Sequence, residues 1–397
     1  MAERLKLAVI GDLHIAVPRG ANDTQLEIDP GRKLHGLSVE LLSATIDEVN
    51  AEPDLAAALI LGDLTRNSEL FNHEVARELL ARLRMPYSIV LGNHDLLRER
   101  PPGIAYEGAA HLDREDVAEF YRDQGFPAGM TRYLIELPGG VVLVVLDSNR
   151  SLAELAAAGV PIIDQEAGFI GKSQLDWLDG VLAQITAAGR LPLLAAHHAL
   201  LEQSPAEHPK HLLYRAFKSW RIADSAPLLE CLQRHRVPLL LSGHLHAQSI
   251  NVADGLYNLV TSAAVSYPHA WRLLTITEQA IHIETRKLAA IPSCPDLQAR
   301  SRQWMAEGMS QLIRQRMPSL PMAAGVSERL TEYVSASGWW PRFCDGTLAG
   351  FAVDASEMPI SNPIARMLAA QIATTINEYG PWKAARPDAN TLTIPLS

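Results

Sequence analysis

The stretch LKLAVIGDLH, residues 5–14, joins an apolar run directly to a glycine, an aspartate and a histidine. Leu5 to Ile10 has the length and composition of a buried strand. Gly11 permits a tight turn after it, and Asp12 and His14, two residues apart, can then point to the same side of the chain. An aspartate and a histidine held together beyond the end of a core strand are candidate ligands for a metal ion.

Four more segments repeat this arrangement of a strand-like run that ends in polar, metal-binding residues. They are Gly62-Asp63, Gly92-Asn93-His94-Asp95, His197-His198 and Gly243-His244-Leu245-His246. The runs that precede them are Ala57–Leu61, Tyr87–Leu91, Leu193–Ala196 and Pro238–Leu241. In open α/β sheets, ligands bind just beyond the carboxyl ends of the strands. We therefore expect all five segments to converge on one site, although they are spread over more than 230 residues.

The alternation of strand-like and helical patterns over residues 1–288 predicts an α/β domain. Amphipathic helices are expected at Ser38–Asn50 and Ser173–Ile185, and a further strand at Val141–Asp147. Three later runs follow one another with short turns, so we expect them to be antiparallel strands. These runs are Leu256–Ser262, Arg272–Thr277 and Ala280–Thr285.

The composition changes near residue 290, and residues 291–397 have a mainly helical pattern. Helices are expected at Leu297–Leu312, Ser327–Ala336 and Ile364–Glu378. Trp339 and Trp340 are expected to anchor the core of this C-terminal extension. Because the extension contains no catalytic motif, we interpret it as a lid over the pocket or as a surface for homo-oligomerisation.

The net charge of −10 argues against a surface for long nucleic acids or anionic membranes, which are bound through lysine and arginine. It does not exclude a small phosphoester substrate, because metal cations would supply positive charge locally. The three cysteines are widely separated, as is typical of reduced thiols. Residues 1–10 lack the features of a signal peptide, and the apolar runs are too short to span a bilayer. We therefore expect a cytoplasmic protein that does not bind membranes.

The combined set of aspartate, asparagine and histidine side chains is larger than one metal ion needs and suits two. Mixed nitrogen and oxygen ligands favour Mn, Fe or Zn, as divalent or trivalent ions. Asp63 has two carboxylate oxygens and is suited to bridge both ions. Two ions about 3.5–4 Å apart can clamp a phosphoryl group and hold a hydroxide between them, whose pKa falls toward about 7.

We expect the three residues of the segment Asn93-His94-Asp95 to have three different roles. Asn93 can offer its side-chain carbonyl to a metal ion. His94 would then face the substrate, where it stabilises charge or protonates the leaving alkoxide. Asp95 is expected to fix the tautomer of His94 and to raise its pKa.

The succession Asp-x-His, Gly-Asp, Gly-Asn-His-Asp, His and Gly-His-x-His over about residues 5–288 resembles the calcineurin-like metallophosphoesterase superfamily. The resemblance implies a four-layer α/β/β/α sandwich, here with a C-terminal helical extension, and a dinuclear metal centre. It implies that one metal is held by Asp12, His14, Asp63 and His246, and the other by Asp63, Asn93, His197 and His244. His94 takes the substrate-facing position, and His198 lines the pocket with Asn93 and His94 as substrate-binding residues.

One loop departs from the pattern of this superfamily. The usual His-His-Pro-Pro reads His197-His198-Ala199-Leu200 here. We expect the loss of both prolines to loosen this loop.

Two other segments, Val144–Ser148 and Gly171–Leu178, are similar to the class III cyclic-nucleotide phosphodiesterase group. Simpler interpretations stay open for both. Asp147 can be a residue at a strand end that caps a loop. Gln174–Leu178 can be an amphipathic helix that buries Leu175 and Leu178.

The leading hypothesis is a phosphoric diester hydrolase for a small substrate such as a cyclic nucleotide or a glycerophosphodiester. The alternatives are a phosphomonoesterase or a nucleotide pyrophosphatase. A non-catalytic scaffold is disfavoured, because such scaffolds are expected to lose ligands and none is lost here.

The polar loops at 16–36, 97–132, 148–172 and 199–226 are expected to form pocket walls, with plain surface loops as the alternative. The first of these loops carries Arg19, Arg32 and Lys33. We interpret these three residues as part of a solvated loop rather than as phosphate contacts.

Overall fold

Two six-stranded β-sheets pack face to face in the computed structural model, which describes residues 3–18, 33–96, 109–123, 125–150, 167–207, 221–316, 338–348, 352, 354 and 363–396. The first sheet has the order β12 (Thr391–Pro395), β11 (Ala280–Lys287), β10 (Ala270–Thr277), β1 (Glu3–Ile10), β2 (Leu55–Ile60) and β3 (Tyr87–Ile89). The second has the order β4 (Tyr133–Leu137), β5 (Val141–Val145), β6 (Leu191–Ala195), β7 (Leu239–Ser242), β9 (Leu256–Val260) and β8 (Ser249–Ala253).

Side chains that alternate along the strands bury both faces of each sheet. Leu143 and Val145 of β5 join the core between the sheets, where Leu7 of β1 also lies. Val142 and Val144 point the other way and pack against helices. β5 is therefore buried on both faces, as its continuous apolar sequence requires.

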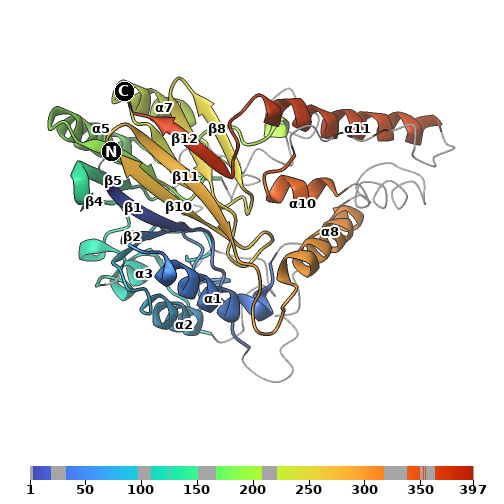
Figure 1. Cartoon of the computed structure of the whole chain (residues 1–397), viewed down its shortest axis with the longest axis horizontal. Coiled ribbons are helices and arrows are strands. Elements are labelled where there is room, and N and C mark those ends of the chain that lie inside the picture. The colour runs from blue at the N-terminus through green and yellow to red at the C-terminus, as the bar shows by residue number, and fades with distance from the viewer. Residues whose placement is uncertain are drawn as a thin grey trace.

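Helices cover the two outer faces of the pair of sheets (Figure 1). On the side of the first sheet these are α1 (Ser38–Ala51), α2 (Leu70–Leu80) and α3 (Arg114–Phe120), and on the side of the second they are α5 (Lys172–Ala187) and α7 (Ser225–Arg234). The expected four-layer α/β/β/α sandwich is thus confirmed.

Parallel strands bring the candidate ligand segments to one edge. β1, β2 and β3 are parallel to one another in the first sheet, as are β5, β6 and β7 in the second. Each candidate ligand follows the carboxyl end of one of these strands: Asp12 after β1, Asp63 after β2, Asn93 after β3, His197 after β6 and His244 after β7.

The strand predicted at 256–262 is present, but it does not pair with the strand that follows it in the chain, as the sequence analysis expected. β9 lies in the second sheet, parallel to β7 and antiparallel to β8. The chain then crosses to the first sheet, where β10 and β11 form the expected antiparallel pair. Hydrophobic periodicity locates a strand but does not tell which neighbour it pairs with. The strands β4, β8 and β12 were not predicted from the sequence.

The C-terminal extension contains α8 (Leu297–Arg316), α10 (Trp339–Cys344) and α11 (Pro363–Ala384), gathered at one end of the sheets, on the right of Figure 1. Trp339 and Trp340 are buried and contact Phe343 and Tyr379, which confirms their predicted anchoring position. The chain then returns to the first sheet as β12, an addition to the expected helical pattern. The helix predicted at 327–336 lies outside the described residues.

Among the helices of the described residues, none has the length and apolar character needed to cross a membrane.

Candidate metal centre

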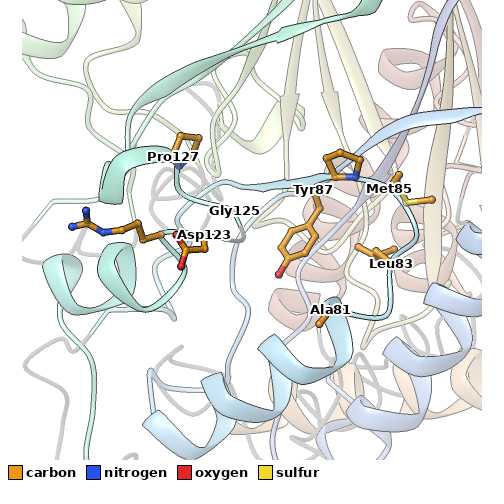
Figure 2. Close-up of a pocket in the computed structure, with 9 residues that line it drawn as sticks. Ala81, Leu83, Met85, Tyr87, Asp123, Gly125 and Pro127 are labelled. Atoms are coloured by element: carbon orange, nitrogen blue, oxygen red, sulfur yellow. The ribbon is translucent and has the colours of Figure 1, made fainter.

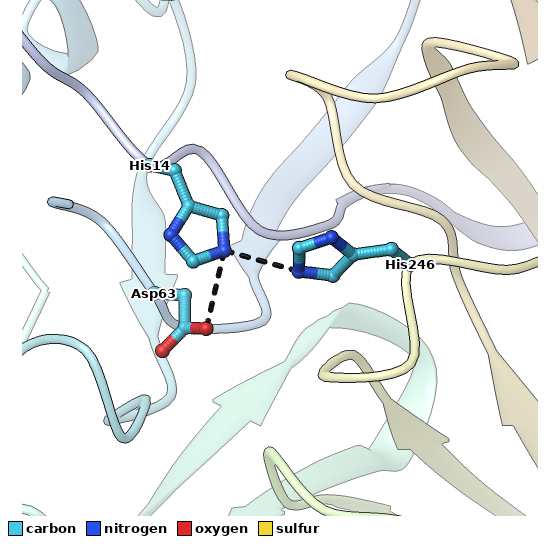
Figure 3. A group of neighbouring side chains, drawn as sticks. All are labelled: His14, Asp63 and His246. Atoms are coloured by element: carbon cyan, nitrogen blue, oxygen red, sulfur yellow. Dashed lines mark hydrogen bonds and ion pairs between the residues drawn. The ribbon is translucent and has the colours of Figure 1, made fainter. Parts of the chain in front are cut away.

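The five candidate segments meet at the carboxyl edge of the two sheets. His14, Asp63 and His246 form a first buried group there (Figure 3). Nε2 of His14 lies 3.0 Å from Nε2 of His246 and 3.3 Å from Oδ2 of Asp63. Oδ2 of Asp12 lies 3.6 Å from Nε2 of His246, so Asp12 belongs to the same group.

A second group consists of Asp63, Asn93, His197 and His244. Oδ1 of Asn93 lies 3.1 Å from Nε2 of His197 and 3.0 Å from Nδ1 of His244. Oδ1 of Asp63 lies 3.4 Å from Nε2 of His197, whereas its Oδ2 faces His14. The structure thus brings all the predicted ligands together, and Asp63 lies between the two groups.

The spacing and chemistry of these atoms fit metal ligation. Ligand atoms about 2.0–2.2 Å from one ion are themselves about 3–3.5 Å apart, which is close to the separations within both groups. Each group mixes imidazole nitrogen with carboxylate or amide oxygen, a donor set that suits borderline cations. The residues present therefore fit two metal ions that share Asp63.

The backbone holds four candidate ligands in a conformation that residues other than glycine rarely adopt. The φ angle is +43° at His14, +49° at Asp63, +68° at His244 and +52° at His246. Left-handed residues cost about 1–2 kcal/mol each and cluster at functional sites, where the surrounding structure fixes them. The sequence did not predict these positive φ angles, because the identity of a histidine or an aspartate does not indicate its backbone conformation.

Two glycines allow the segments to approach one another closely. A Cβ atom on Gly62, whose φ is +93°, would lie 2.8 Å from Nδ1 of His197. A Cβ atom on Gly92 would collide with the backbone nitrogen and the carboxylate of Asp63. These glycines are therefore needed for close packing of the ligand segments as well as for turning the chain.

His94 lies beside the first group, with its ring centroid 4.7 Å from that of His14. Its Nδ1 lies 2.6 Å from the carbonyl oxygen of Arg66. A carbonyl oxygen can only accept, so Nδ1 carries a proton and donates it. The Arg66 carbonyl thus fixes the tautomer of His94.

The expectation that Asp95 fixes this tautomer is therefore wrong. Asp95 is completely buried, and its carboxylate accepts hydrogen bonds from backbone N–H groups. These donors are Leu64 at 2.6 Å, Thr65 at 3.2 Å and Gly92 at 3.0 Å. Asp95 ties together the segments that follow β2 and β3, and so positions the loop that carries His94.

His198 is completely buried next to the second group. Its Nδ1 lies 2.8 Å from Oγ of Ser148, and its ring centroid lies 4.4 Å from that of His244. These contacts make it a support for a candidate ligand. Its predicted contact with substrate stays a prediction.

Ser148 belongs to one of the segments that resemble the class III group, and the structure joins the other segment to it. Gln174 accepts a 3.0 Å hydrogen bond from the N–H of Asp147 and donates a 2.8 Å bond to the carbonyl of Asp147. Helix α5 also buries Leu178, as the simpler interpretation expected. The helix therefore packs on the core and fixes the strand end that carries Ser148.

The loop at Ala199-Leu200 is not loosened by the lack of prolines, and that prediction is wrong. The N–H groups of Leu200 and Leu201 donate to Oδ1 of the buried Asn258, over 2.7 and 3.0 Å. A proline at position 200 would have no N–H to donate. Asn258 thus fixes the loop, which has no proline at positions 199 and 200.

Lys33 is not part of a solvated loop, which corrects the interpretation from sequence. The residue is only 8% exposed. Its Nζ lies 3.4 Å from Nδ1 of His14 and 3.4 Å from Nε2 of His94. Arg19 and Arg32 lie outside the described residues, as do parts of all four predicted pocket walls.

Burial and neighbouring charges shift the pKa values of the candidate ligands. Burial alone would lower the pKa of His197, but the facing Asp63 carboxylate raises it to about 9. Burial would raise the pKa of Asp63, but His197 holds it well below its usual value. Burial lowers the pKa of His14 well below its usual value, and the Lys33 ammonium adds to this shift. His14 is therefore neutral and ready to hold a metal ion, whereas His197 would have to lose a proton to do so.

The cavity in Figure 2, of about 450 Å³, is not part of this centre. It opens beside Tyr87 and Met85, at the amino end of β3. Asn93 follows the carboxyl end of the same strand. The cavity therefore lies at the opposite end of β3 from the candidate ligands.

The sequence profile of the calcineurin-like phosphoesterase family matches residues 5–248. The chain belongs to this family. The prediction of a metallophosphoesterase is confirmed at the level of the family, and the protein is a hydrolytic enzyme. Its buried histidine and aspartate groups are suited to hold metal ions.

Individual relatives are distant from this phosphoesterase. A probable cyclic nucleotide phosphodiesterase of Rhodopseudomonas palustris (strain ATCC BAA-98 / CGA009) is 27% identical over 231 residues, which are 57% of this chain and 70% of the relative. A dimetal phosphatase from Danio rerio has a TM-score of 0.54 at 14% identity, covering 72% of this chain and 97% of its own. Purple acid phosphatase PPD1 from yellow lupin (Lupinus luteus) seeds has a TM-score of 0.48 at 14% identity, covering 72% and 52%. The Danio rerio structure supports the fold alone.

The dependence of stability on pH tests the electrostatics of the centre. Burial raises the pKa of Asp12 to about 7 and that of Asp95 to about 8, and Asp63 raises the pKa of His197 to about 9. A group whose pKa is raised by folding contributes stability that is lost as the pH rises through its folded pKa. We expect the melting temperature of EDTA-treated protein to fall from pH 6.5 to pH 9.

Manganese-loaded protein should lose much less stability over this range, because the metal takes the place of the protons. Differential scanning fluorimetry of both forms makes the comparison. A flat profile for the EDTA-treated protein would contradict these pKa shifts.

The Asn258→Ala substitution tests how the 199–201 loop is fixed. It leaves two buried N–H groups without their acceptor, each at a cost of about 1–3 kcal/mol. We expect the free energy of unfolding, measured with urea, to fall by about 2 kcal/mol or more. Asn50→Ala is the matched control, since Asn50 also bonds two backbone groups, Arg82 and Arg84, but near the surface. Equal losses of unfolding free energy in the two variants would mean that the buried hydrogen bonds of Asn258 stabilise the protein no more than the exposed ones of Asn50 do.

Proposed function

We propose that this phosphoesterase hydrolyses a small phosphodiester at the carboxyl edge of its sheets, with two bound metal ions. The observation that carries the proposal is Asp63, whose two carboxylate oxygens face two separate ligand groups. Two cations bound there would supply Lewis-acid charge and an activated water.

We assign the ligands to two sets on the basis of the two groups. One set is Asp12, His14, Asp63 and His246, and the other is Asp63, Asn93, His197 and His244. The approach of the Asn93 Oδ1 atom to two imidazoles supports the amide oxygen as its ligand atom. The mixture of nitrogen and oxygen favours manganese, iron or zinc in both positions.

His94 acts on the substrate in this proposal. Because the Arg66 carbonyl holds its Nδ1–H, Nε2 is the nitrogen that meets the substrate. Protonated on both nitrogens, the imidazolium would donate from Nε2 to an oxygen of the phosphoryl group, or pass that proton to the departing alkoxide and remain as a neutral ring with Nδ1–H. Asp95 positions the loop of His94 and takes no part in proton transfer.

The substrate class has three supports. The bacterial relative is described as a probable cyclic nucleotide phosphodiesterase. The contacts of Gln174 with Asp147 and of Ser148 with His198 give a physical basis to the segments that resemble the class III group. The net charge of −10 disfavours long nucleic acids. We therefore favour a cyclic nucleotide or a glycerophosphodiester over a monoester or a pyrophosphate.

We further propose a catalytic domain at residues 1–288 and an extension at 291–397 that serves as a lid or as a contact between copies of the chain. The extension contacts the chain next to a candidate ligand, since the N–H of Gln248, two residues after His246, donates to the carbonyl of Cys344 in α10 over 2.7 Å. The three cysteines Cys231, Cys294 and Cys344 are buried thiols rather than disulfides, which supports a cytoplasmic location.

The Asp63→Ala variant tests the two-metal proposal. It removes the shared ligand, so we expect loss of bound metal and a fall in hydrolysis of bis-p-nitrophenyl phosphate on the order of 10³. Elemental analysis and steady-state kinetics measure both effects. Asp176→Ala, which removes an exposed carboxylate on α5, is the control. Turnover of the diester by Asp63→Ala at the rate of the unmodified enzyme would overturn the proposal.

The His94→Ala variant separates catalysis from metal binding. We expect it to keep both metals and to lose about 10²–10⁴ in rate, as removal of a general acid does. The loss should be larger for a diester with a phenyl leaving group than for one with a p-nitrophenyl group, because the nitrophenolate departs without a proton. His282→Ala, at an exposed histidine of β11, is the control. Loss of metal would instead assign His94 as a ligand.

A further inference from the structure

Three residues of different chemistry meet between α5 and α7, the helices on the outer face of the second sheet (Figure 1). Asp179 lies in α5, Cys231 lies in α7, and His235 directly follows α7. Oδ1 of Asp179 lies 2.7 Å from Nε2 of His235 and 3.6 Å from Sγ of Cys231. We call these three residues the α5–α7 cluster. It gathers a carboxylate, an imidazole and a thiol, with one atom of each within 4.8 Å of the other two.

The packing of the two helices determines the geometry of the α5–α7 cluster. Cys231 and His235 are four residues apart, so they share one face of α7. The N–H of His235 donates to the carbonyl of Cys231 over 3.2 Å, which continues the helical pattern to the histidine. Leu232 of α7 and Leu182 of α5 are fully buried in the same hydrophobic core. The cluster is therefore held together by the core beneath it.

The α5–α7 cluster is separate from the candidate metal centre and can be reached from solvent. His235 precedes β7, whereas the candidate ligand His244 follows it, so the two sites lie toward opposite ends of this strand. A cavity of about 660 Å³ borders His235 and Arg234. The side chain of Asp179 is 44% exposed. An ion can therefore enter the cluster from outside.

The donor atoms of the α5–α7 cluster suit zinc. Zinc binds thiolate sulfur, imidazole nitrogen and carboxylate oxygen. A sulfur and an oxygen ligand of one tetrahedral zinc ion are about 3.6 Å apart. The separation between Cys231 Sγ and Asp179 Oδ1 has this value. The ring of His235 lies at hydrogen-bond distance from Oδ1 and would move outward by about 0.7 Å to bind the same ion. Three protein ligands leave the fourth position to water.

Arg234 competes with a metal ion for the carboxylate of Asp179. Its Nη1 lies 2.7 Å from Oδ1, the same oxygen that His235 contacts. The arginine side chain is 59% exposed, and exposed ion pairs of this kind are weak. Within the described residues, the hydrogen bonds of this carboxylate all go to Oδ1. The guanidinium can therefore turn to Oδ2 or to solvent when a metal ion takes Oδ1.

We propose that the α5–α7 cluster is a further metal site, which binds one zinc ion through Sγ of Cys231, Nε2 of His235 and the carboxylate of Asp179. The ion replaces the thiol proton, which passes to solvent, and the imidazole keeps its single proton on Nδ1. Burial raises the pKa of Cys231 to about 12, so the metal-free thiol is protonated. The bound ion joins α5 to α7. It thereby holds the helix whose Gln174 fixes the strand end at Asp147.

Cobalt(II) is the probe for this site. A cobalt thiolate has a strong charge-transfer band in the near ultraviolet, and none of the candidate ligands at the metal centre is a cysteine. The band is titrated in reduced, manganese-loaded enzyme, and elemental analysis counts zinc ions per chain after incubation with zinc. Cys231→Ser and His235→Gln each remove a ligand. Cys294→Ser is the matched control, since the thiol of Cys294 is also buried and lies 3.7 Å from the carboxylate of Asp296.

We expect the unmodified enzyme and Cys294→Ser to develop the band with one cobalt ion per chain. Cys231→Ser should show no band and should hold one zinc ion fewer per chain. His235→Gln should bind cobalt at least about 100-fold more weakly, because even the loss of a residue that only orients a ligand costs about 10–100-fold. Arg234→Met should bind cobalt up to about fivefold more tightly, since it removes an exposed ion pair that competes for Asp179.

Three outcomes would overturn the inference. A reduced, unmodified enzyme without the cobalt band would mean that the three side chains form only a hydrogen-bonded network around Asp179. A band that persists in Cys231→Ser would assign the thiolate to another cysteine. Unchanged cobalt affinity in His235→Gln would exclude the imidazole as a ligand. Circular dichroism checks the folding of each variant, and His235→Gln, which keeps the thiol, decides the question if Cys231→Ser does not fold.

Discussion

The position of Asp63 is the constraint on which the rest of the centre depends. Its backbone carbonyl accepts the N–H groups of Leu13 and His14 over 2.9 and 2.7 Å, and its Oδ1 accepts the N–H of His94 over 2.7 Å. One residue thus fixes the segments that follow β1, β2 and β3 relative to one another. Each of these bonds contributes on the order of 1 kcal/mol, which offsets the left-handed backbone at Asp63. This network holds the carboxylate between the two groups, so the centre is preorganised for metal ions.

Strand-end motifs predicted an α/β fold and the convergence of the candidate ligand segments, because both follow from local rules, and the family resemblance added the four layers and the two ligand sets. The apolar composition of a run such as Leu5–Ile10 indicates that the strand is buried, and the residue after its glycine must lie at the edge of the sheet. Contacts between distant segments could not be predicted in the same way. Nothing local shows that β9 leaves the sheet of β10, that Asp95 bonds to Leu64 rather than to His94, or that Lys33 turns inward.

Buried polar side chains of a second layer hold the ligand loops in place. Asn258 accepts the N–H groups of Leu200 and Leu201, Gln174 bonds both backbone groups of Asp147, and Ser148 contacts His198. Each bond replaces water that the buried backbone would otherwise need. The family resemblance located some of these residues but not their partners, since any buried amide or hydroxyl of suitable reach can serve. Such a layer can vary in sequence while the geometry of the centre is kept.

The distance along the chain between facing residues has a consequence for how the molecule forms. His14 and His246 are 232 positions apart, and Asn93 and His197 are 104 apart. Contacts of such high sequence separation form slowly, because the loops between them must close first. The histidines come face to face only after both sheets have assembled. Ligation of a metal ion by the full set of side chains would therefore require both sheets to be in place.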